Sequence, residues 1–378
     1  MAKTQFRTVK IVLFIILTIP FWMWLCWYFS PKHKLVVAII DKTVLSKSQL
    51  PHASLTWILR NNRYTKTSSQ LYTSSDYFGT FPAGDGRFKI KGLERLNNTE
   101  LNNLSAYSDI AYITDTYGLN NTSADEAIQA SGGLSPKDLT FLKAMKQRKK
   151  LVIAEFNTFA SPTLPQQRKD FEDTFKIKWT GWVGKYFSSL DTLKNKDLPK
   201  ELVNNYKKQH FNKWPFSGSG IVFLSKENKI VVLENGSDLT SGVPYIVTQK
   251  IEREKYNVPK TLEYPFWFDV IETSRTNTIV SFYDIRVTKK GLDKLASNGL
   301  SPQFPAIIKH TKDYNFFYLA GDFADNTVCP NGASFKGISI FRKLFYNNKN
   351  ASDQANFFWA FYNPFMSKVL DDYSKSRN

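Results

Sequence analysis

Three acidic side chains occur where strand-like runs of apolar residues end, and these are the residues whose types and spacing most directly suggest chemistry. Asp41 follows LVVAII, Asp115 follows DIAYIT, and Glu155 lies in LVIAEF. In an open sheet of parallel strands the carboxyl ends of the strands meet at one edge, where ligands bind. We therefore expect Asp41, Asp115 and Glu155 to share that edge. The structural alternative is that each acid caps a following turn or helix.

A pair of these carboxyl groups could hydrolyse a glycosidic bond. A carboxylate that emerges from an apolar strand, as Glu155 does, is partly desolvated, which raises its pKa. Glu155 and Asp115 are therefore the candidate catalytic pair, one as proton donor and the other as base or nucleophile. The separation of the two carboxyl groups decides between hydrolysis and binding.

The candidate ligand-binding set is wider than this pair. It adds Asn157, directly after the third strand, and Asp322 and Asp325 in the turn AGDFADN, for which a solvated turn is the alternative. Two cysteines and four histidines are too few for a Cys-rich or His-rich zinc site, so no metal is expected, although acids that share one edge could also bind a cation. Neither phosphate-binding glycine motif follows a strand, so no cofactor is expected.

The order of apolar runs predicts an α/β fold. Buried strands are expected at 35–40, 109–114 and 151–156, with helices between them. Ser135 and Pro136 have the residue types of a helix cap and first helical position. This alternation predicts a doubly wound, mostly parallel sheet.

The second half of the chain has a different pattern of predicted strands and helices. Residues 220–233 form a predicted hairpin. Closely spaced strands, one short helix and an aromatic C-terminal helix then predict a smaller α+β domain; the strands are expected at 266–271, 278–287, 304–309 and 315–320, and the helices at 289–297 and from about 352. The expected organisation is residues 1–34 as tail and anchor, 35–257 as the α/β domain and 258–378 as the α+β domain.

Residues Ile11–Phe29 form an uncharged run of nineteen residues, about the thickness of the hydrocarbon core of a bilayer. No small-residue cleavage site follows, which favours a signal anchor over a cleaved signal peptide. Three basic residues precede the run. They predict a single-pass protein of the cell membrane, in contact with the bilayer through residues 11–29, with its body on the extracytoplasmic side. A buried helix is the alternative.

The segments DIAYITDTYG and GGLSPKDLTFLKAMKQRKKLVIAEFN resemble the class I glutamine amidotransferase-like fold of membrane-anchored bacterial envelope proteins. The resemblance covers about residues 35–250 and is shared with flavodoxin-like domains. In active members a cysteine nucleophile occupies the turn after the third strand, where this chain has Glu155-Phe156-Asn157. Cys329 is distant in sequence and no His-x-Glu pair occurs, so the resemblance implies a fold and no amidotransferase activity.

Net charge and composition indicate which classes of binding partner the chain favours. The chain carries a net charge of +18 and 15% aromatic residues, which favours acidic polymers or glycans as partners. With an extracytoplasmic body, nucleic acid is disfavoured. The leading hypothesis is a non-catalytic binding or assembly component of the cell envelope that recognises a glycan or an envelope protein. The alternatives are a carbohydrate-active hydrolase using Glu155 and Asp115, and a protein that binds polyanions through charge.

Overall fold

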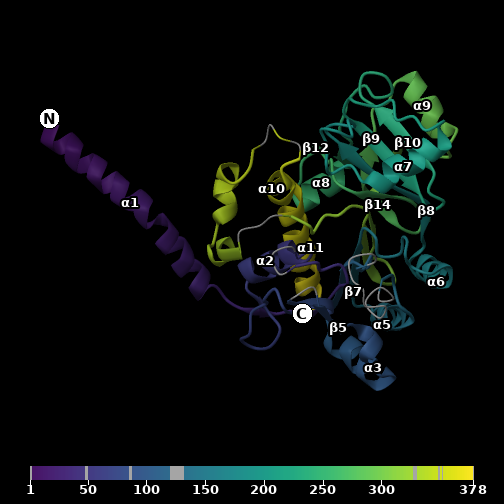
Figure 1. The fold of residues 1–378 in the computed structure, drawn as a ribbon. Helices are drawn as coiled ribbons and strands as arrows, with labels where there is room; N and C mark the ends of the chain where they lie inside the picture. Colours follow the sequence, from purple (N-terminus) through teal and green to yellow (C-terminus); the bar gives the residue numbers. More distant parts are fainter. Residues whose placement is uncertain are drawn as a thin grey trace.

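The computed structural model of the chain describes residues 2–46, 50–84, 87–119, 132–326, 330–347, 350 and 352–377. A ten-stranded mixed sheet forms its centre (Figure 1). In spatial order its strands are β12 (Thr261–Glu263), β11 (Tyr245–Thr248), β14 (Thr278–Asp284), β15 (Gln303–His310), β16 (Asn315–Leu319), β7 (Leu151–Glu155), β6 (Ile110–Asp115), β2 (Val37–Asp41), β4 (Phe78–Gly84) and β5 (Arg87–Lys91).

The prediction of a mostly parallel sheet was wrong. The four strand pairs from β16 to β4 are parallel, and the other five pairs of the described sheet are antiparallel. Antiparallel strands such as β15 and β16 are nearly as buried as β6 and β7. Continuous burial on both faces produces the same unbroken apolar runs whichever way neighbouring strands point, so these runs did not reveal strand direction.

Within the parallel part, the order β4–β2–β6–β7–β16 is that of a doubly wound fold of the flavodoxin type. From β2 the chain first adds β4 on one side and then adds β6 and β7 on the other. The point between β2 and β6, where the direction of winding reverses, is where such sheets leave a crevice beyond their carboxyl ends.

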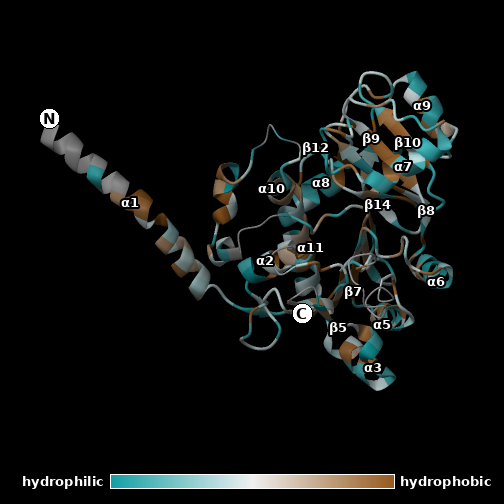
Figure 2. Cartoon of the chain, viewed as in Figure 1, coloured by the Kyte–Doolittle hydropathy of each residue, from teal (hydrophilic) through white to brown (hydrophobic). Residues whose placement is uncertain are grey.

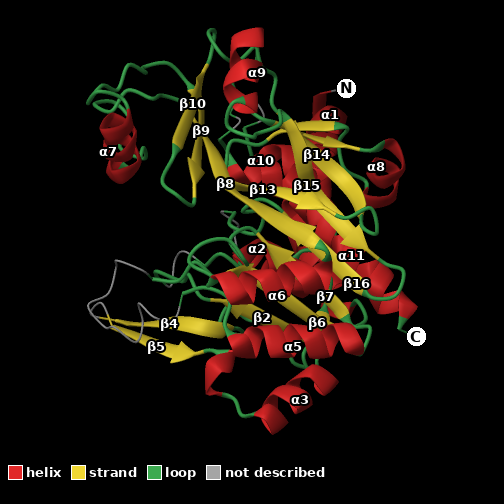
Figure 3. Cartoon of the chain, turned by 90° about the vertical axis from the view of Figure 1, so that its right-hand side faces the viewer, coloured by secondary structure: helices red, strands yellow, loops and turns green. Residues whose placement is uncertain are grey.

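Helices cover both faces of this sheet (Figure 3). Helix α5 packs on β6 and β7, and its neighbours on that face are α3 and α6. On the opposite face α11 contacts α2 and α8. The bounds are α2 (Ala53–Asn61), α3 (Asn98–Tyr107), α5 (Pro136–Gln147), α6 (Pro165–Phe175), α8 (Lys250–Tyr256) and α11 (Asn363–Ser376). Short helical turns join or precede them: η1 (Leu93–Arg95), η2 (Pro330–Ser334), η3 (Ile338–Leu344), α10 (Gln354–Phe357) and η4 (Phe358–Tyr362).

A second, antiparallel sheet has four described strands. Their order is β10 (Ile230–Glu234), β9 (Gly220–Ser225), β8 (Ile177–Phe187) and β13 (Phe268–Thr273). Helices α7 (Lys200–Gln209) and α9 (Lys289–Ala296) pack against β10 and, like α6, carry hydrophilic residues (Figure 2). The expected 220–233 hairpin is confirmed by the pairing of Ile230 with Leu224. Strands from both sides of residue 257 enter each sheet, and the proposed division there stays a prediction.

Local sequence explains the elements that position the carboxyl edge. Every residue of β2, β6 and β7 is buried. Helix α5 begins as expected, because the Ser135 side chain accepts from the Asp138 amide and Asp138 accepts from the Ser135 amide. This reciprocal capping fixes the start of the helix that connects β6 with β7. The short parallel pair of β1 (His33–Lys34) and β3 (Tyr64–Thr65) lies outside the large sheet.

The expected transmembrane helix at residues 11–29 is contradicted, and with it the single-pass membrane localisation. In the described part of the chain no helix has the length and apolar character that a bilayer crossing requires. Helix α1 (Ala2–Phe29) extends from the body (Figure 1), and its last turns pack on protein. Trp27 is buried, its indole donates to the Arg60 carbonyl over 3.2 Å, and the Arg63 guanidinium lies 4.8 Å from its ring centroid. Earlier side chains of the run are exposed, Phe14 at 68% and Leu17 at 70%, so hydropathy alone did not show which part of the run packs on protein.

A buried ion-pair cluster joins the end of β2 to α5. The ammonium group of Lys42 donates to Asp138 over 2.6 Å, to the Gly133 carbonyl over 3.1 Å, and to Glu94. Burial works to lower the pKa of Lys42, but Asp138 and Glu94 outweigh it and raise that pKa. The cluster therefore holds a charged lysine beneath the carboxyl edge.

We expect Lys42→Ala to lower the free energy of unfolding by about 3–5 kcal/mol, because it leaves the fully buried Asp138 without its counter-charge. Lys143→Ala, which breaks the exposed 3.4 Å pair with Asp170, should cost no more than about 1 kcal/mol. Urea denaturation of both variants measures the difference. Equal losses would contradict a structural role for the Lys42 cluster.

Candidate functional site

The three acids that end the first buried strands lie at one edge of the large sheet. Asp41 of β2 and Asp115 of β6 are register partners across the parallel pair, at the point where winding reverses. Glu155 ends β7, the next strand, which also runs parallel. The edge predicted from the sequence is therefore present, although each carboxyl group has a different environment.

Asp41 is fully buried and paired with a histidine. Its Oδ2 atom lies 2.7 Å from Nδ1 of His52, and its Oδ1 atom accepts from the Thr43 amide over 3.1 Å. The other ring nitrogen of His52 faces the Ser74 carbonyl over 2.9 Å and must donate to it, because a carbonyl oxygen only accepts. One proton is thus shared between Nδ1 and Asp41. This pair supports the cavity wall from behind, and Asp41 does not line the cavity.

Asp115 is the member of the trio that lines a cavity. Its Oδ1 accepts from the Tyr117 amide over 2.6 Å. Burial raises the pKa of Asp115 to about 7, and repulsion from Asp41 adds to the rise. Near neutral pH its carboxyl group is therefore divided between the neutral and ionised forms, so it can donate a hydrogen bond as well as accept one.

Glu155 is closed off from the cavities. Its side chain accepts from the Tyr112 hydroxyl and, over 3.0 Å, from the Ala324 amide, and only 1% of the residue surface is exposed. The Tyr112 hydroxyl lies 2.5 Å from that of Tyr362, on η4. Burial raises the pKa of Glu155 to about 8. Sequence reasoning was right that an apolar strand raises this pKa, but the side chain lines neither of the two cavities described below.

Asn157 connects Asp115 with a buried acid that the sequence did not single out. The side chain of Asn157 bonds to Asp115. The backbone N–H of Asn157 donates to Asp269 of β13 over 3.2 Å. The backbone of Asn157 is left-handed (φ 61°), a conformation that asparagine tolerates. Asp269 also accepts from the Tyr318 hydroxyl, and burial raises its pKa to about 7. Its Oδ1 atom is buried with no hydrogen-bond partner among the described residues.

The turn after β16 adds two further acids to the same cavity. Asp322 and Asp325 line it together with Asp115. Burial, followed by repulsion from Asp325 and Asp115, raises the pKa of Asp322 well above its ordinary value. Burial and repulsion from Asp41 raise the pKa of Asp325, against the attraction of Lys185. The predicted acidic turn therefore faces a cavity and is not simply solvated.

The cavity at the carboxyl edge has a volume of about 1100 Å³. Besides the three acids, hydroxyl, amide and aromatic side chains line it. They come from the segments after β2 and β16, from α2 and η2, and from the loop between β3 and β4; among them are Thr43, Thr56, Trp57, Arg60, Tyr72, Thr73, Ser74, Asn326, Asn331, Ser334 and Gln354.

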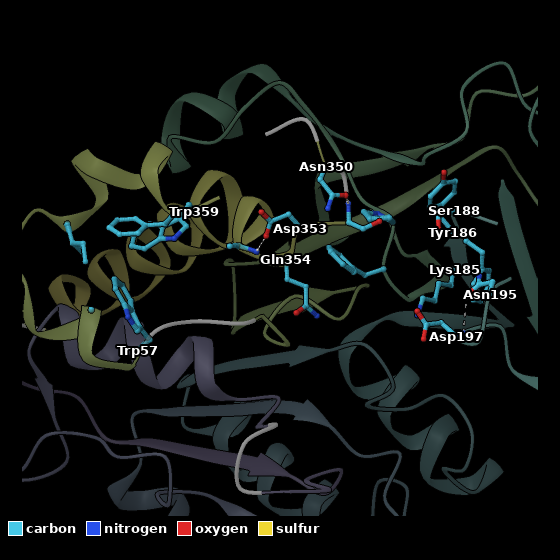
Figure 4. A pocket seen from close by; sticks show the side chains of 18 of the residues that line it. Trp57, Lys185, Tyr186, Ser188, Asn195, Asp197, Asn350, Asp353, Gln354 and Trp359 are labelled. Atoms are coloured by element: carbon cyan, nitrogen blue, oxygen red, sulfur yellow. Dashed lines mark hydrogen bonds between the residues drawn. The ribbon is translucent and has the colours of Figure 1, made fainter. Parts of the chain in front are cut away.

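A second cavity of about 920 Å³ adjoins the first (Figure 4). The two share Trp57, Asn331, Phe335 and Gln354. In Figure 4, Trp57 and Trp359 lie at one end, Lys185 and Asp197 at the other, with Asp353 and Gln354 between.

The arrangement does not form a metal centre. No group of three or more potential metal-binding side chains occurs within the described ranges of the chain. Asp41, Asp115 and Glu155 already accept hydrogen bonds from protein groups, and burial raises the pKa values of Asp115 and Glu155. Cys329, the lone cysteine of the body, lies outside the described residues.

Comparison with known proteins does not assign the chain. No protein-family model and no curated protein matches it. A Bacteroides uniformis ATCC 8492 protein described as ThuA-like is 9% identical, with 90% of this chain and 94% of that one covered and a TM-score of 0.38. A cytoplasmic protein of Salmonella typhimurium LT2 is 10% identical, with 90% and 98% covered and a TM-score of 0.37. Likenesses this distant leave the function to be inferred from the residues of this chain.

Several site residues were missed by sequence reasoning. His52 precedes α2 and carries no motif, and Asp269 sits inside a strand whose partner is known only from the fold. Trp57 directly precedes Ile58 and Leu59 in α2 and is itself 4% exposed, so its sequence context is that of a core residue. An unpaired acid in the apolar run FWFDVI was the one available signal for Asp269.

Glu155→Gln should make stability less dependent on pH. The folded-state pKa of about 8 exceeds the ordinary value of 4.5, so the folded chain retains a proton that the unfolded chain has lost. The retained proton stabilises the folded state fully below pH 4.5. This stabilisation is lost as pH rises to about 8, at roughly 1.4 kcal/mol per pKa unit. The side-chain amide of Gln can accept from the Ala324 backbone N–H and donate to the Tyr112 oxygen, whose own hydroxyl can then donate to Tyr362.

Urea denaturation at pH 5, 6, 7 and 8 measures this effect. Relative to the wild-type protein, Glu155→Gln should gain a few kcal/mol between pH 5 and 8. Glu201→Gln, at an exposed position on α7, should follow the wild-type pH profile. Parallel pH profiles for all three proteins would show that Glu155 is already ionised in the folded state.

Proposed function

We propose that this protein binds a glycan in the cavity at the carboxyl edge of the parallel strands, and that it binds without hydrolysing. The observation that carries the proposal is the convergence of Asp115, Asp322 and Asp325 with Trp57 around one cavity at the winding reversal. Cavities at such points are the usual ligand sites of doubly wound sheets. The chemistry of the lining favours a polyhydroxylated ligand.

Sugar hydroxyls both donate and accept hydrogen bonds, and sugar rings also present apolar faces. Burial raises the pKa of Asp115 to about 7, so near neutral pH its carboxyl group can serve as donor or acceptor, and burial also raises the pKa of Asp325. Asn326 and Asn331 provide both functions through their amides. Trp57 and Tyr72 add apolar atoms to the cavity wall, although most of each ring is buried, with 4% and 1% of the residue surface exposed.

Hydrolysis is less well supported than binding. A glycosidase needs two carboxyl groups that both face the scissile bond. Glu155, the expected partner of Asp115, is bonded to Tyr112 and Ala324 and lines neither cavity. Binding through net positive charge is also less well supported, because three acids line this cavity beside Arg60.

The resemblance to the class I glutamine amidotransferase-like fold stays a proposal about fold. The strand order β4–β2–β6–β7–β16 supports it. Asn157, with its amide side chain, occupies the turn where active members of that family carry cysteine. The proposed activity is therefore recognition, with a glycan as the ligand and an envelope protein as the alternative partner.

Calorimetric titration with oligosaccharides tests the proposal. The probes are β-1,4-linked glucose, N-acetylglucosamine and xylose, and α-1,4-linked glucose, each at lengths of one to six units. We expect at least one series to bind at pH 7 without release of new reducing ends. Asp325→Ala should weaken that binding about 10- to 100-fold, the loss of a hydrogen bond that involves a charged group.

Asp173→Ala is the matched control, because Asp173 is an exposed acid on α6 that does not line either cavity. It should bind like the wild-type protein. Equal weakening by Asp173→Ala, the absence of binding in all four series, or steady release of reducing ends would each contradict the proposed function.

A further inference from the structure

The two cavities adjoin through a shared wall that includes Trp57 and Gln354. Their volumes of about 1100 and 920 Å³ each lie near the upper end of the roughly 300–1,000 Å³ typical of a small-molecule site. One sugar unit would leave most of this space filled with water. The continuity of the lining therefore points to an extended ligand.

We propose that the ligand is a linear oligosaccharide that occupies both cavities, passing Trp57 and continuing onto the aromatic pair of Trp359 and Phe345. This inference rests on the proposed glycan-binding function and adds the length of the ligand and its path. It also assigns a binding role to the second cavity.

The aromatic geometry of the second cavity suits sugar rings. Trp57 meets Trp359 edge to face, with ring centroids 5.3 Å apart and planes at 84°. Trp359 in turn stacks on Phe345, with centroids 5.4 Å apart and planes at 26°. Phe345 is 44% exposed, although large apolar side chains in this body are mostly buried. An exposed ring supported by a buried one offers a fixed apolar platform at low cost in side-chain entropy.

Polar groups continue beyond the platform. Asp353 caps α10 and accepts from the Ala355 amide over 3.0 Å, which fixes its carboxylate at the middle of the cavity. Gln354 follows on the same turn. These groups can bond to hydroxyls along the edge of a chain whose faces rest on the aromatic rings.

Lys185 provides a further contact at the far end (Figure 4). Its ammonium group lies 5.4 Å from the ring centroid of Phe187 and 5.5 Å from that of Trp267. Among the described residues it makes no hydrogen bond or ion pair, so its N–H groups can donate to ligand oxygens. The second cavity thus has apolar contacts at one end and hydrogen-bonding groups along the rest of its length.

Chain-length dependence distinguishes this ligand from two separate small molecules. In the four oligosaccharide series named above, the affinity of the series that binds should rise with length, with the hexamer at least about tenfold tighter than the shortest oligomer that binds. Phe345→Ala should weaken hexamer binding about 3- to 10-fold, the contribution of one aromatic contact, and leave the shortest oligomer unchanged.

Phe211→Ala is the control, because Phe211 is 97% exposed and lines neither cavity. It should change neither affinity. Binding that does not increase with length, or a Phe345→Ala variant that weakens all lengths equally or none, would overturn this inference and leave the proposed function standing. Failure of every oligosaccharide to bind would instead refute the proposed function itself.

Discussion

The burial of carboxyl groups at the ends of parallel strands is the constraint on which this structure depends. An ionised carboxylate inside a protein costs several kcal/mol unless it is paired or hydrogen-bonded. Asp41 is bonded to His52. Glu155, bonded to Tyr112 and the Ala324 backbone N–H, keeps its proton to a pKa of about 8. Asp269, bonded to Tyr318 and the Asn157 backbone N–H, has a pKa raised to about 7. Each of these hydrogen bonds also joins two segments of the chain. The interactions that stabilise the buried carboxyl groups therefore also hold the edge of the sheet together.

That constraint explains why distant parts of the chain build one edge. Strand β16 lies beside β7, which places the following turn, with Ala324, against Glu155. Strand β13 belongs to the small sheet, yet its Asp269 accepts from Asn157 at the end of β7. The same turn after β16 carries Asp322 and Asp325 into the cavity. The site is therefore complete only when both sheets have formed.

Strands and helix starts that short-range sequence patterns encode were predicted correctly. Contacts that depend on which distant segments meet in the fold were missed. Continuous apolar runs located β2, β6 and β7, and Ser135 located the start of α5. The insertion of β16 beside β7 joins segments about 160 residues apart, and no local pattern specifies such a neighbour. His52 was missed because its role depends on meeting Asp41. The N-terminal apolar run was misassigned from its hydropathy: Trp27 packs on protein, whereas Phe14, Leu17 and Phe21 of the same run are more than half exposed.

The acids at the edge bond to different protein groups, and these bonds bear on which kind of ligand the edge can bind. A cation site needs several ionised oxygens that converge on one point. Here Asp41 and Glu155 are bonded to protein groups, while burial raises the pKa of Asp115 to about 7 and also raises the pKa values of Asp322 and Asp325. A neutral acid offers one donor and one acceptor side by side, which matches a hydroxyl group far better than an ion. A polyhydroxylated ligand therefore stays the proposal that the lining of this cavity supports best.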